Sequence, residues 1–202
     1  MLFCNEDDDM IKMNSKLISC VLFFSLITVS NLCASDKSAF IEAGISTGIP
    51  VYGDKEIRAL NSKYSDDGHR VIIGSVVNVN VRISDNLFFF LGNDSTFDFC
   101  WNKNNHSNHF ETAFYPGLKA YPGFWGLNFS CAYTVGIRKD FVPSENDLDK
   151  SFWGNGFRLG LEYDFSKNTD SMFPALGAYY RFCPRGSYHY DNIISLYVVM
   201  PF

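Results

Sequence analysis

The chain has 202 residues, with 17 lysine and arginine residues against 22 aspartate and glutamate residues, a formal net charge of -5. This acidic balance provides no electrostatic footprint for nucleic acid, so no nucleic-acid partner is expected. Hydrophobic residues make up 47% of the chain and aromatic residues 17%, a composition that excludes an intrinsically disordered protein.

The first feature along the chain is an apolar run of 13 residues, Leu17–Val29. It is shorter than the roughly 20 residues of a spanning helix. Lysines precede it and small residues follow it, which predicts a cleaved signal peptide over residues 1–35, with a buried helix or a lipidated cysteine as alternatives. Residues 6–9 are all acidic and oppose the usual positive start, so translation is expected to begin at Met10 or Met13.

From residue 36 onward, apolar residues alternate with polar or small residues at a period of two, which is the pattern of β-strands. Asn93 and Ser95 interrupt the apolar face of one strand, so a β-bulge or register shift is expected there. The connection after the first strand contains Asp54–Leu60, which can form a helical turn. Eight segments fit the pattern: Ala39–Ile49, Arg70–Ile83, Leu87–Trp101, Phe110–Tyr121, Trp125–Arg138, Phe157–Phe165, Phe173–Cys183 and Ile194–Phe202.

Two architectures use eight such strands. A soluble barrel or sandwich buries the apolar face, whereas an outer-membrane barrel turns it to lipid and keeps a polar lumen. The second face here combines small residues with charges, which suits a narrow lumen, and long connections alternate with short ones. The sequence therefore predicts an all-β fold, an eight-stranded antiparallel transmembrane β-barrel over residues 36–202, with both termini in the periplasm.

The strand register predicts which side chains face the lumen and which lie at the membrane interfaces. Cys131 is expected to face lipid, and Cys100 and Cys183 to face inward on opposite sides, all as free thiols. Five aromatic residues at strand ends are expected to form two interfacial girdles: Trp101, Phe110, Trp125, Trp153 and Phe165. Eleven inward charges are close to balance, and a barrel this narrow is filled by side chains, so they are expected to form an ion-paired plug: Glu42, Arg82, Asp94, Asp98, Glu111, Lys119, Arg138, Arg158, Glu162, Asp164 and Arg181.

Over residues 36–202 the chain resembles the small eight-stranded outer-membrane barrels of the OmpA and OmpX type, with OmpW-like and opacity-protein relatives. The resemblance rests on the signal peptide, the eight-strand pattern and the alternation at the end of the chain. It implies a Gram-negative or spirochaete-like cell and a monomeric protein in contact with outer-membrane lipids. It also implies that the barrel assembly machinery reads the final alternating residues, Ile194, Leu196, Val198, Met200 and Phe202.

The expected function is a structural or surface-interaction role through the outer loops, without catalysis, cofactor or metal. Host or surface ligands are the expected partners, because recognition concentrates in loops on a rigid scaffold. The OmpW-like resemblance implies an alternative, a carrier or narrow channel for small apolar molecules, which would be lined by Phe88, Phe90, Tyr115 and Tyr179.

A lipid A-modifying enzyme is a second alternative. The resemblance to eight-stranded outer-membrane barrels implies that such an enzyme would use a histidine with a serine and an acid near the outer rim. No motif in the chain identifies such a set. The candidate residues are His106, Ser107 and His109 with Glu111 and Asp98 nearby, and a second option is His189 with Ser187.

Overall fold

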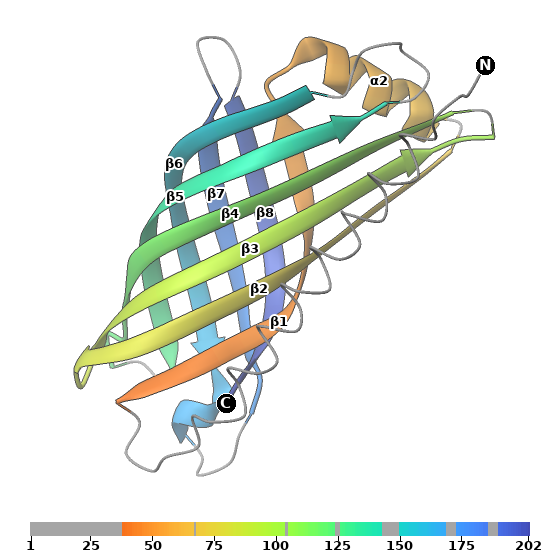
Figure 1. Cartoon of the computed structure of the whole chain (residues 1–202). Helices are drawn as coiled ribbons and strands as arrows, with labels where there is room; N and C mark the ends of the chain where they lie inside the picture. The colour runs from red at the N-terminus through yellow and green to blue at the C-terminus, as the bar shows by residue number, and fades with distance from the viewer. Residues whose placement is uncertain are drawn as a thin grey trace, which may run out of the picture. The chain divides into compact units, whose positions relative to one another are not determined.

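The computed structural model describes residues 38–66, 68–103, 105–123, 126–142, 150–168, 173–185 and 190–202, so the predicted signal peptide lies outside the described residues. Every strand is antiparallel to its neighbours in the chain, and the last strand pairs with the first to close the sheet (Figure 1). The predicted eight-stranded antiparallel barrel is confirmed. Its strands are β1 (Ala39–Tyr52), β2 (His69–Ser84), β3 (Leu87–Trp101), β4 (His106–Ala120), β5 (Leu127–Phe141), β6 (Lys150–Asp164), β7 (Ala175–Pro184) and β8 (Tyr190–Pro201).

Closure of the barrel depends on the seam between β1 and β8. Their pairing runs from Glu42 opposite Pro201 to Tyr52 opposite Asp191, so neither strand leaves an open edge. The backbones approach closely at Gly44, where an added Cβ would lie 1.8 Å from the carbonyl oxygen of Val198. Glycine is therefore the residue that this part of the seam accommodates.

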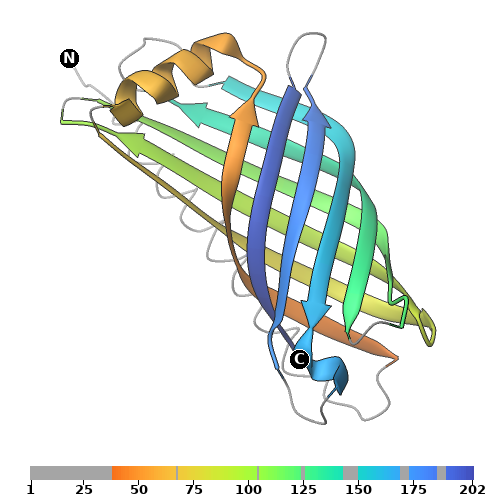
Figure 2. The same cartoon turned by 180° about the vertical axis from the view of Figure 1, so that it is seen from behind.

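The two ends of the barrel differ. The connections after β2, β4 and β6, the start of β1 and the end of β8 lie together at one end, here called the turn end. The other end carries the helix α2 (Lys55–Asp66), which lies across it in both views (Figures 1 and 2), and is called the α2 end. The segment predicted to hold a helical turn thus forms a 12-residue helix. Among the described residues, no helix is long and apolar enough to cross a membrane.

α2 has a local reason to start where it does and an inner face that holds it in place. Asp54 caps the helix, because its Oδ1 accepts a hydrogen bond from the backbone N–H of Glu56 at 2.9 Å. Ile57, Leu60 and Tyr64 are spaced along one side of the helix and are buried. The amphipathic pattern therefore fixes which side of α2 faces the barrel.

Several strands extend further toward the α2 end than the sequence predicted. β4 begins at His106 instead of Phe110, and β5 continues to Phe141 instead of ending at Arg138. β6 and β8 also begin earlier than predicted. Outward side chains in these extensions, such as Asn108, are no longer consistently apolar, so the period-two signal fades although the strand pairing continues.

The β-bulge predicted at Asn93 and Ser95 was wrong. β3 pairs in continuous register with both neighbours through these residues, and the register shift lies between Arg82 and Ser84. Both outward polar side chains are satisfied across the strands, because Asn93 Nδ2 and Ser95 Oγ donate to Thr112 Oγ1 at 3.1 and 2.9 Å. Hydrogen bonding between neighbours therefore removes the need for a bulge.

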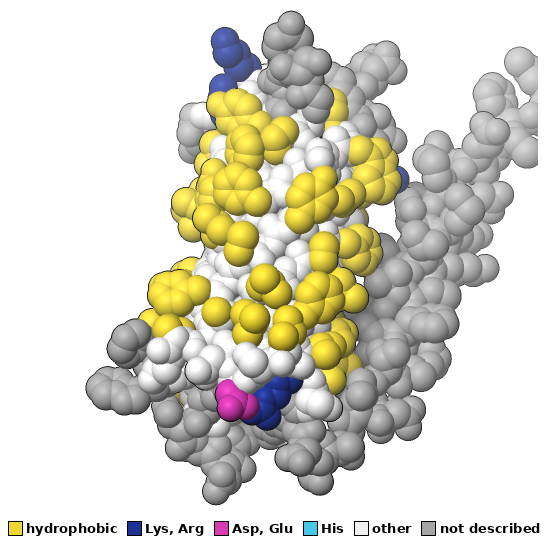
Figure 3. Space-filling view, turned by 90° about the vertical axis from the view of Figure 1, so that its left-hand side faces the viewer, with side chains coloured by type: hydrophobic (Ala, Val, Ile, Leu, Met, Phe, Trp, Pro, Cys, Tyr) yellow, Lys and Arg dark blue, Asp and Glu magenta, His cyan; other side chains and the backbone are white. Residues whose placement is uncertain are grey.

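The outer wall of the barrel is apolar. Ile45, Phe114 and Leu196 are 68%, 66% and 59% exposed, and many other large apolar side chains on all eight strands point outward. Figure 3 shows one face of the wall, where apolar side chains are spread over the strands and few charged ones are visible. This inverted arrangement, with charges inside and apolar side chains outside, is that of a barrel surrounded by lipid.

Candidate functional site

The lumen near the turn end is built around one buried ammonium group. Lys119 Nζ donates to Glu42 Oε1 and Oε2 at 2.7 and 2.8 Å and to Glu162 Oε1 at 3.0 Å. Neutral donors complete the cluster, because Asn128 Nδ2 and Tyr197 Oη also bond to Glu162, at 2.8 and 2.9 Å. All these side chains are buried, so one lysine bridges acids from two distant strands.

Asp164 lies just beyond this cluster at the turn end. Its Oδ2 accepts a hydrogen bond from Tyr121 Oη at 3.3 Å, and its Oδ1 accepts from the backbone N–H of Ser166 at 2.9 Å. Burial raises the pKa of Tyr121 well above the usual value of a phenol. The Tyr121 hydroxyl therefore remains a donor to this carboxylate at physiological pH.

The middle of the lumen is filled by arginines, carboxylates and aromatic rings. Arg181 pairs with Asp94 and, through its second terminal nitrogen, with Glu111 Oε1 at 2.8 Å. The Arg158 guanidinium lies 4.2 Å from the ring centre of Tyr179 and 4.9 Å from that of Tyr115, which are cation–π distances. The two tyrosines thus surround a cation instead of lining an apolar passage.

Toward the α2 end the network includes residues that sequence reasoning missed. Arg185 pairs with Glu111 and Asp191, and Arg138 pairs with Asp191 and with Asp140, the latter at 3.0 Å. All are buried. Arg185, Asp140 and Asp191 were missed because they lie beyond the predicted strand ends, in segments that were interpreted as loops.

Two of the predicted lumen charges have partners close to the barrel ends. Arg82 does not join the network, which corrects the prediction: its side chain is 44% exposed and pairs with Asp85 at the β2–β3 turn. Arg82 sits at the register shift that ends β2, where the wall no longer encloses it. Asp98 is buried but bonds to Arg70, at 2.9 and 2.8 Å, and to Tyr52 Oη at 2.8 Å.

A second polar cluster lies directly beneath α2. Ser107 Oγ is 2.8 Å from His109 Nε2, and His109 Nδ1 is 2.7 Å from Asp140 Oδ1. Asn61 of α2 places its Oδ1 3.1 Å from Ser107 Oγ and 3.0 Å from His109 Nε2. All four side chains are buried, so this cluster joins α2 to the ends of β4 and β5 that lie at the α2 end of the barrel.

Only some of the residues predicted for a catalytic site belong to this cluster. His106 is exposed at the start of β4 and is not part of the cluster. Glu111 and Asp98, the predicted acids, pair with arginines instead, and Asp140 occupies the position expected of them. His189 and Ser187 lie outside the described residues.

The remaining sequence predictions can be placed on the barrel. Cys100 and Cys183 are buried, Cys131 is exposed, and all three are free, as predicted. Trp153, Phe165 and Trp101 are 68%, 45% and 38% exposed near strand ends, Phe110 packs on Phe97 with ring centres 4.7 Å apart, and Trp125 lies outside the described residues. Their role as interfacial girdles stays a prediction. The described part of the chain contains no cluster of side chains suited to hold a metal.

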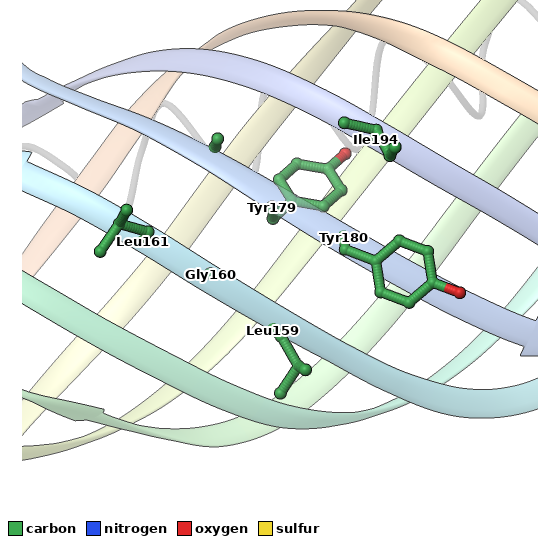
Figure 4. A pocket seen from close by; sticks show the side chains of 7 residues that line it. Leu159, Gly160, Leu161, Tyr179, Tyr180 and Ile194 are labelled. Carbon is green, nitrogen blue, oxygen red and sulfur yellow. The ribbon is translucent and has the colours of Figure 1, made fainter.

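A shallow apolar hollow opens on the outer wall between β6, β7 and β8. Figure 4 shows Leu159 and Leu161 on β6, Tyr180 on the neighbouring β7, and Ile194 on β8 beyond it. Gly160 lies between the two leucines on β6. No charged residue is among those that line it, so the surface it offers is mainly apolar.

Solved structures of two bacterial proteins resemble this barrel. Ail, the attachment invasion locus protein of Yersinia pestis, matches with a TM-score of 0.54 at 9% identity, over 81% of this chain and 97% of Ail. The same protein in complex with the heparin analogue sucrose octasulfate gives a TM-score of 0.53 at 10% identity, with the same coverage. Neisserial surface protein A matches with a TM-score of 0.50 at 13% identity, over 82% of this chain and 98% of that protein.

No protein-family model and no curated protein sequence matches the chain. At these low identities the structural matches establish the fold alone. The chain is a small eight-stranded β-barrel with the fold of Ail and Neisserial surface protein A.

Proposed function

We propose that this chain is a monomeric protein of the bacterial outer membrane, that its lumen is closed, and that it acts by binding partners at the cell surface. One observation carries the proposal: buried ion pairs occupy the lumen from Lys119 near the turn end to Arg138 near the α2 end. An apolar wall around a charged, filled interior suits a lipid environment and leaves no room for a wide pore.

The proposed orientation places the α2 end outside the cell. Barrels of this kind have short periplasmic turns and longer outer connections, and the β2–β3 connection here is only residues 85–86. The first residue of β1 and the last of β8 lie at that same end, so the proposal assigns both to the periplasm. We also propose that residues 1–35 direct secretion of the chain. The assembly machinery then recognises the final residues of the chain.

Two measurements test the closed, outward-facing barrel. Reconstituted in a planar bilayer, the full chain should give little or no steady conductance, and a large stable open channel would contradict the filled lumen. In intact cells, added protease should cut on the α2 end, whereas cleavage at the β2–β3 turn would overturn the orientation. A folded chain should also migrate differently on gels before and after heating.

The outer face of α2 favours an anionic partner, and we propose sulfated polysaccharide. Lys55, Arg58 and Lys63 are all exposed on this helix, on the side opposite its buried residues. Among the described side chains of the helix, they outnumber the one exposed acid, Glu56. Ail, which has the same fold, was crystallised with a sulfated heparin analogue. Clustered cations on a rigid scaffold bind such ligands chiefly by charge, with an affinity that falls as salt rises.

A heparin column tests this partner. The folded chain in detergent should be retained at low salt and eluted by added salt, and replacing the three α2 cations by glutamine should abolish retention. Arg82→Gln, which removes one exposed cation at the opposite end, is the matched control and should elute like the wild type. Equal retention of the triple variant would contradict recognition through α2.

A further inference from the structure

The cluster beneath α2 has a geometry that the surface-binding role does not require. Ser107, His109 and Asp140 form a chain of two short contacts, 2.8 Å from Ser107 Oγ to His109 Nε2 and 2.7 Å from His109 Nδ1 to Asp140 Oδ1. These are the distances, and the two different ring nitrogens, by which a serine nucleophile, a base and an orienting acid are recognised.

The barrel itself holds the three groups in this order. Ser107 and His109 are two residues apart on β4, so both side chains point to the same inner face. Asp140 is the cross-strand neighbour of His109 in β5. Asp140 is fixed in turn by Arg138, whose Nε donates to Asp140 Oδ2 at 3.1 Å. Asp140 therefore orients the His109 imidazole, and Arg138 holds Asp140 in place.

We propose that Ser107, His109 and Asp140 form a hydrolytic site for carboxylic esters that reach the α2 end of the barrel. Ser107 Oγ attacks the ester carbonyl carbon while its proton passes to His109 Nε2, and Asp140 stabilises the imidazolium that forms. The bond to the alcohol oxygen then breaks, and the alcohol leaves with the proton from His109. Water repeats the sequence on the acyl-serine, releasing the carboxylic acid and restoring Ser107.

α2 closes this site in the structure described here, and Asn61 is the residue that fills it. The carbonyl oxygen of the Asn61 side chain lies 3.1 Å from Ser107 Oγ, where the carbonyl group of an ester would have to lie. It also lies 3.0 Å from His109 Nε2, so it competes for the contact between serine and base. A substrate therefore enters only when α2 moves, and Asn61 holds the site inactive until then.

The attachment of α2 is compatible with such movement. Besides Asn61, the inner face of the helix contributes Leu60 and Tyr64 to a small apolar cluster with Cys100 and Val142. Cys100 belongs to β3, and its Sγ also donates to the backbone carbonyl of Asn61 at 3.4 Å, so α2 is attached by a small set of contacts at the rim of the barrel. Elements with few buried apolar contacts open at the lowest free-energy cost.

A fluorophosphonate probe tests the nucleophile directly, because it forms a stable adduct with an activated serine and releases fluoride. The folded full chain in detergent micelles should be labelled slowly, with the adduct mapped by mass spectrometry to Ser107. Asn61→Ala should increase the labelling rate tenfold or more, while Ser62→Ala, an exposed position on the same helix, should leave it unchanged. Ser107→Ala should abolish labelling.

Asp140→Asn distinguishes a catalytic triad from a buried hydrogen-bond network with only a structural role, because an asparagine cannot stabilise the imidazolium. It should lower the labelling rate by about a hundredfold or more in the Asn61→Ala background. Each variant must first show the heat-dependent gel shift of the folded barrel. Absence of labelling in folded Asn61→Ala, labelling that persists without Ser107, or an unchanged rate in Asp140→Asn would each overturn the proposal.

Two substrates distinguish where the ester comes from. Folded Asn61→Ala is mixed with a short-chain p-nitrophenyl ester in solution and, separately, reconstituted into vesicles of ester-linked phospholipid. Release of nitrophenol alone indicates a soluble ester, and release of fatty acid in the vesicles indicates a lipid ester presented by the membrane. Hydrolysis of neither by a variant that the probe does label would contradict an esterase and overturn the proposal.

Discussion

Lys119 offers a sharp test of the lumen network. Its Nζ is within 3.0 Å of carboxylate oxygens from Glu42 and Glu162, and the lysine side chain is 3% exposed. Lys119→Gln removes the one cation that this cluster contains and leaves two carboxylates facing each other away from water. Breaking a buried ion pair by removing one partner costs about 3–5 kcal/mol. Because domains are stable by about 5–15 kcal/mol, such a loss brings the barrel close to unfolding.

The assay is urea unfolding of the full chain in micelles, read as the loss of the folded band on unheated gels. Arg82→Gln is the matched control, because its exposed pair with Asp85 contributes about 0–1 kcal/mol. Neutralising an acid as well, in Lys119→Gln with Glu42→Gln, should restore part of the loss. If the lysine and arginine variants unfolded at the same urea concentration, the lumen pairs would not support the fold.

Three further predictions concern the wall of the barrel. Gly44→Ala should prevent formation of the heat-modifiable folded band, because its Cβ would meet the backbone at 1.8 Å; a normal folded band would contradict the close approach at the seam. Val198→Arg places a charge on the lipid face and should cost about 2–4 kcal/mol near the midplane in urea unfolding, whereas Val198→Leu should unfold like the wild type. In the folded chain a small apolar maleimide that enters the micelle should modify the lipid-facing Cys131, while Cys100 and Cys183 react after unfolding; equal reactivity of all three would refute their placement.

The sequence allowed the wall of the barrel to be predicted well, because lipid on one side and a narrow lumen on the other enforce strict alternation. Leu87–Trp101 was predicted with the bounds that β3 has. The same reasoning failed where that constraint ends. Beyond the apolar belt, outward residues such as Asn108 no longer need to be apolar, so β4 and β5 were predicted too short. The residues gained by these extensions include Ser107, His109 and Asp140.

Other differences arise from contacts that no local pattern contains. Arg82 has the same position in the alternation as the buried charges, yet its place at the end of β2 leaves it exposed. Arg185 follows a strand and still turns inward, where it meets Glu111 and Asp191. No sequence pattern singles out Asn61, and only the position of α2 brings it to His109. Such pairings depend on tertiary placement, which a single sequence does not reveal.

The pairing pattern of the lumen has a consequence for the order of folding. Lys119 and Glu42 are separated by 77 positions in the chain, and Arg181 and Asp94 by 87. No hairpin of neighbouring strands contains both members of either pair, so the charges stay hydrated until distant strands come together. Long-range contacts of this kind slow folding and make its last step cooperative. The ion pairs should therefore form together with the β1–β8 seam, so that they do not stabilise a partly folded barrel.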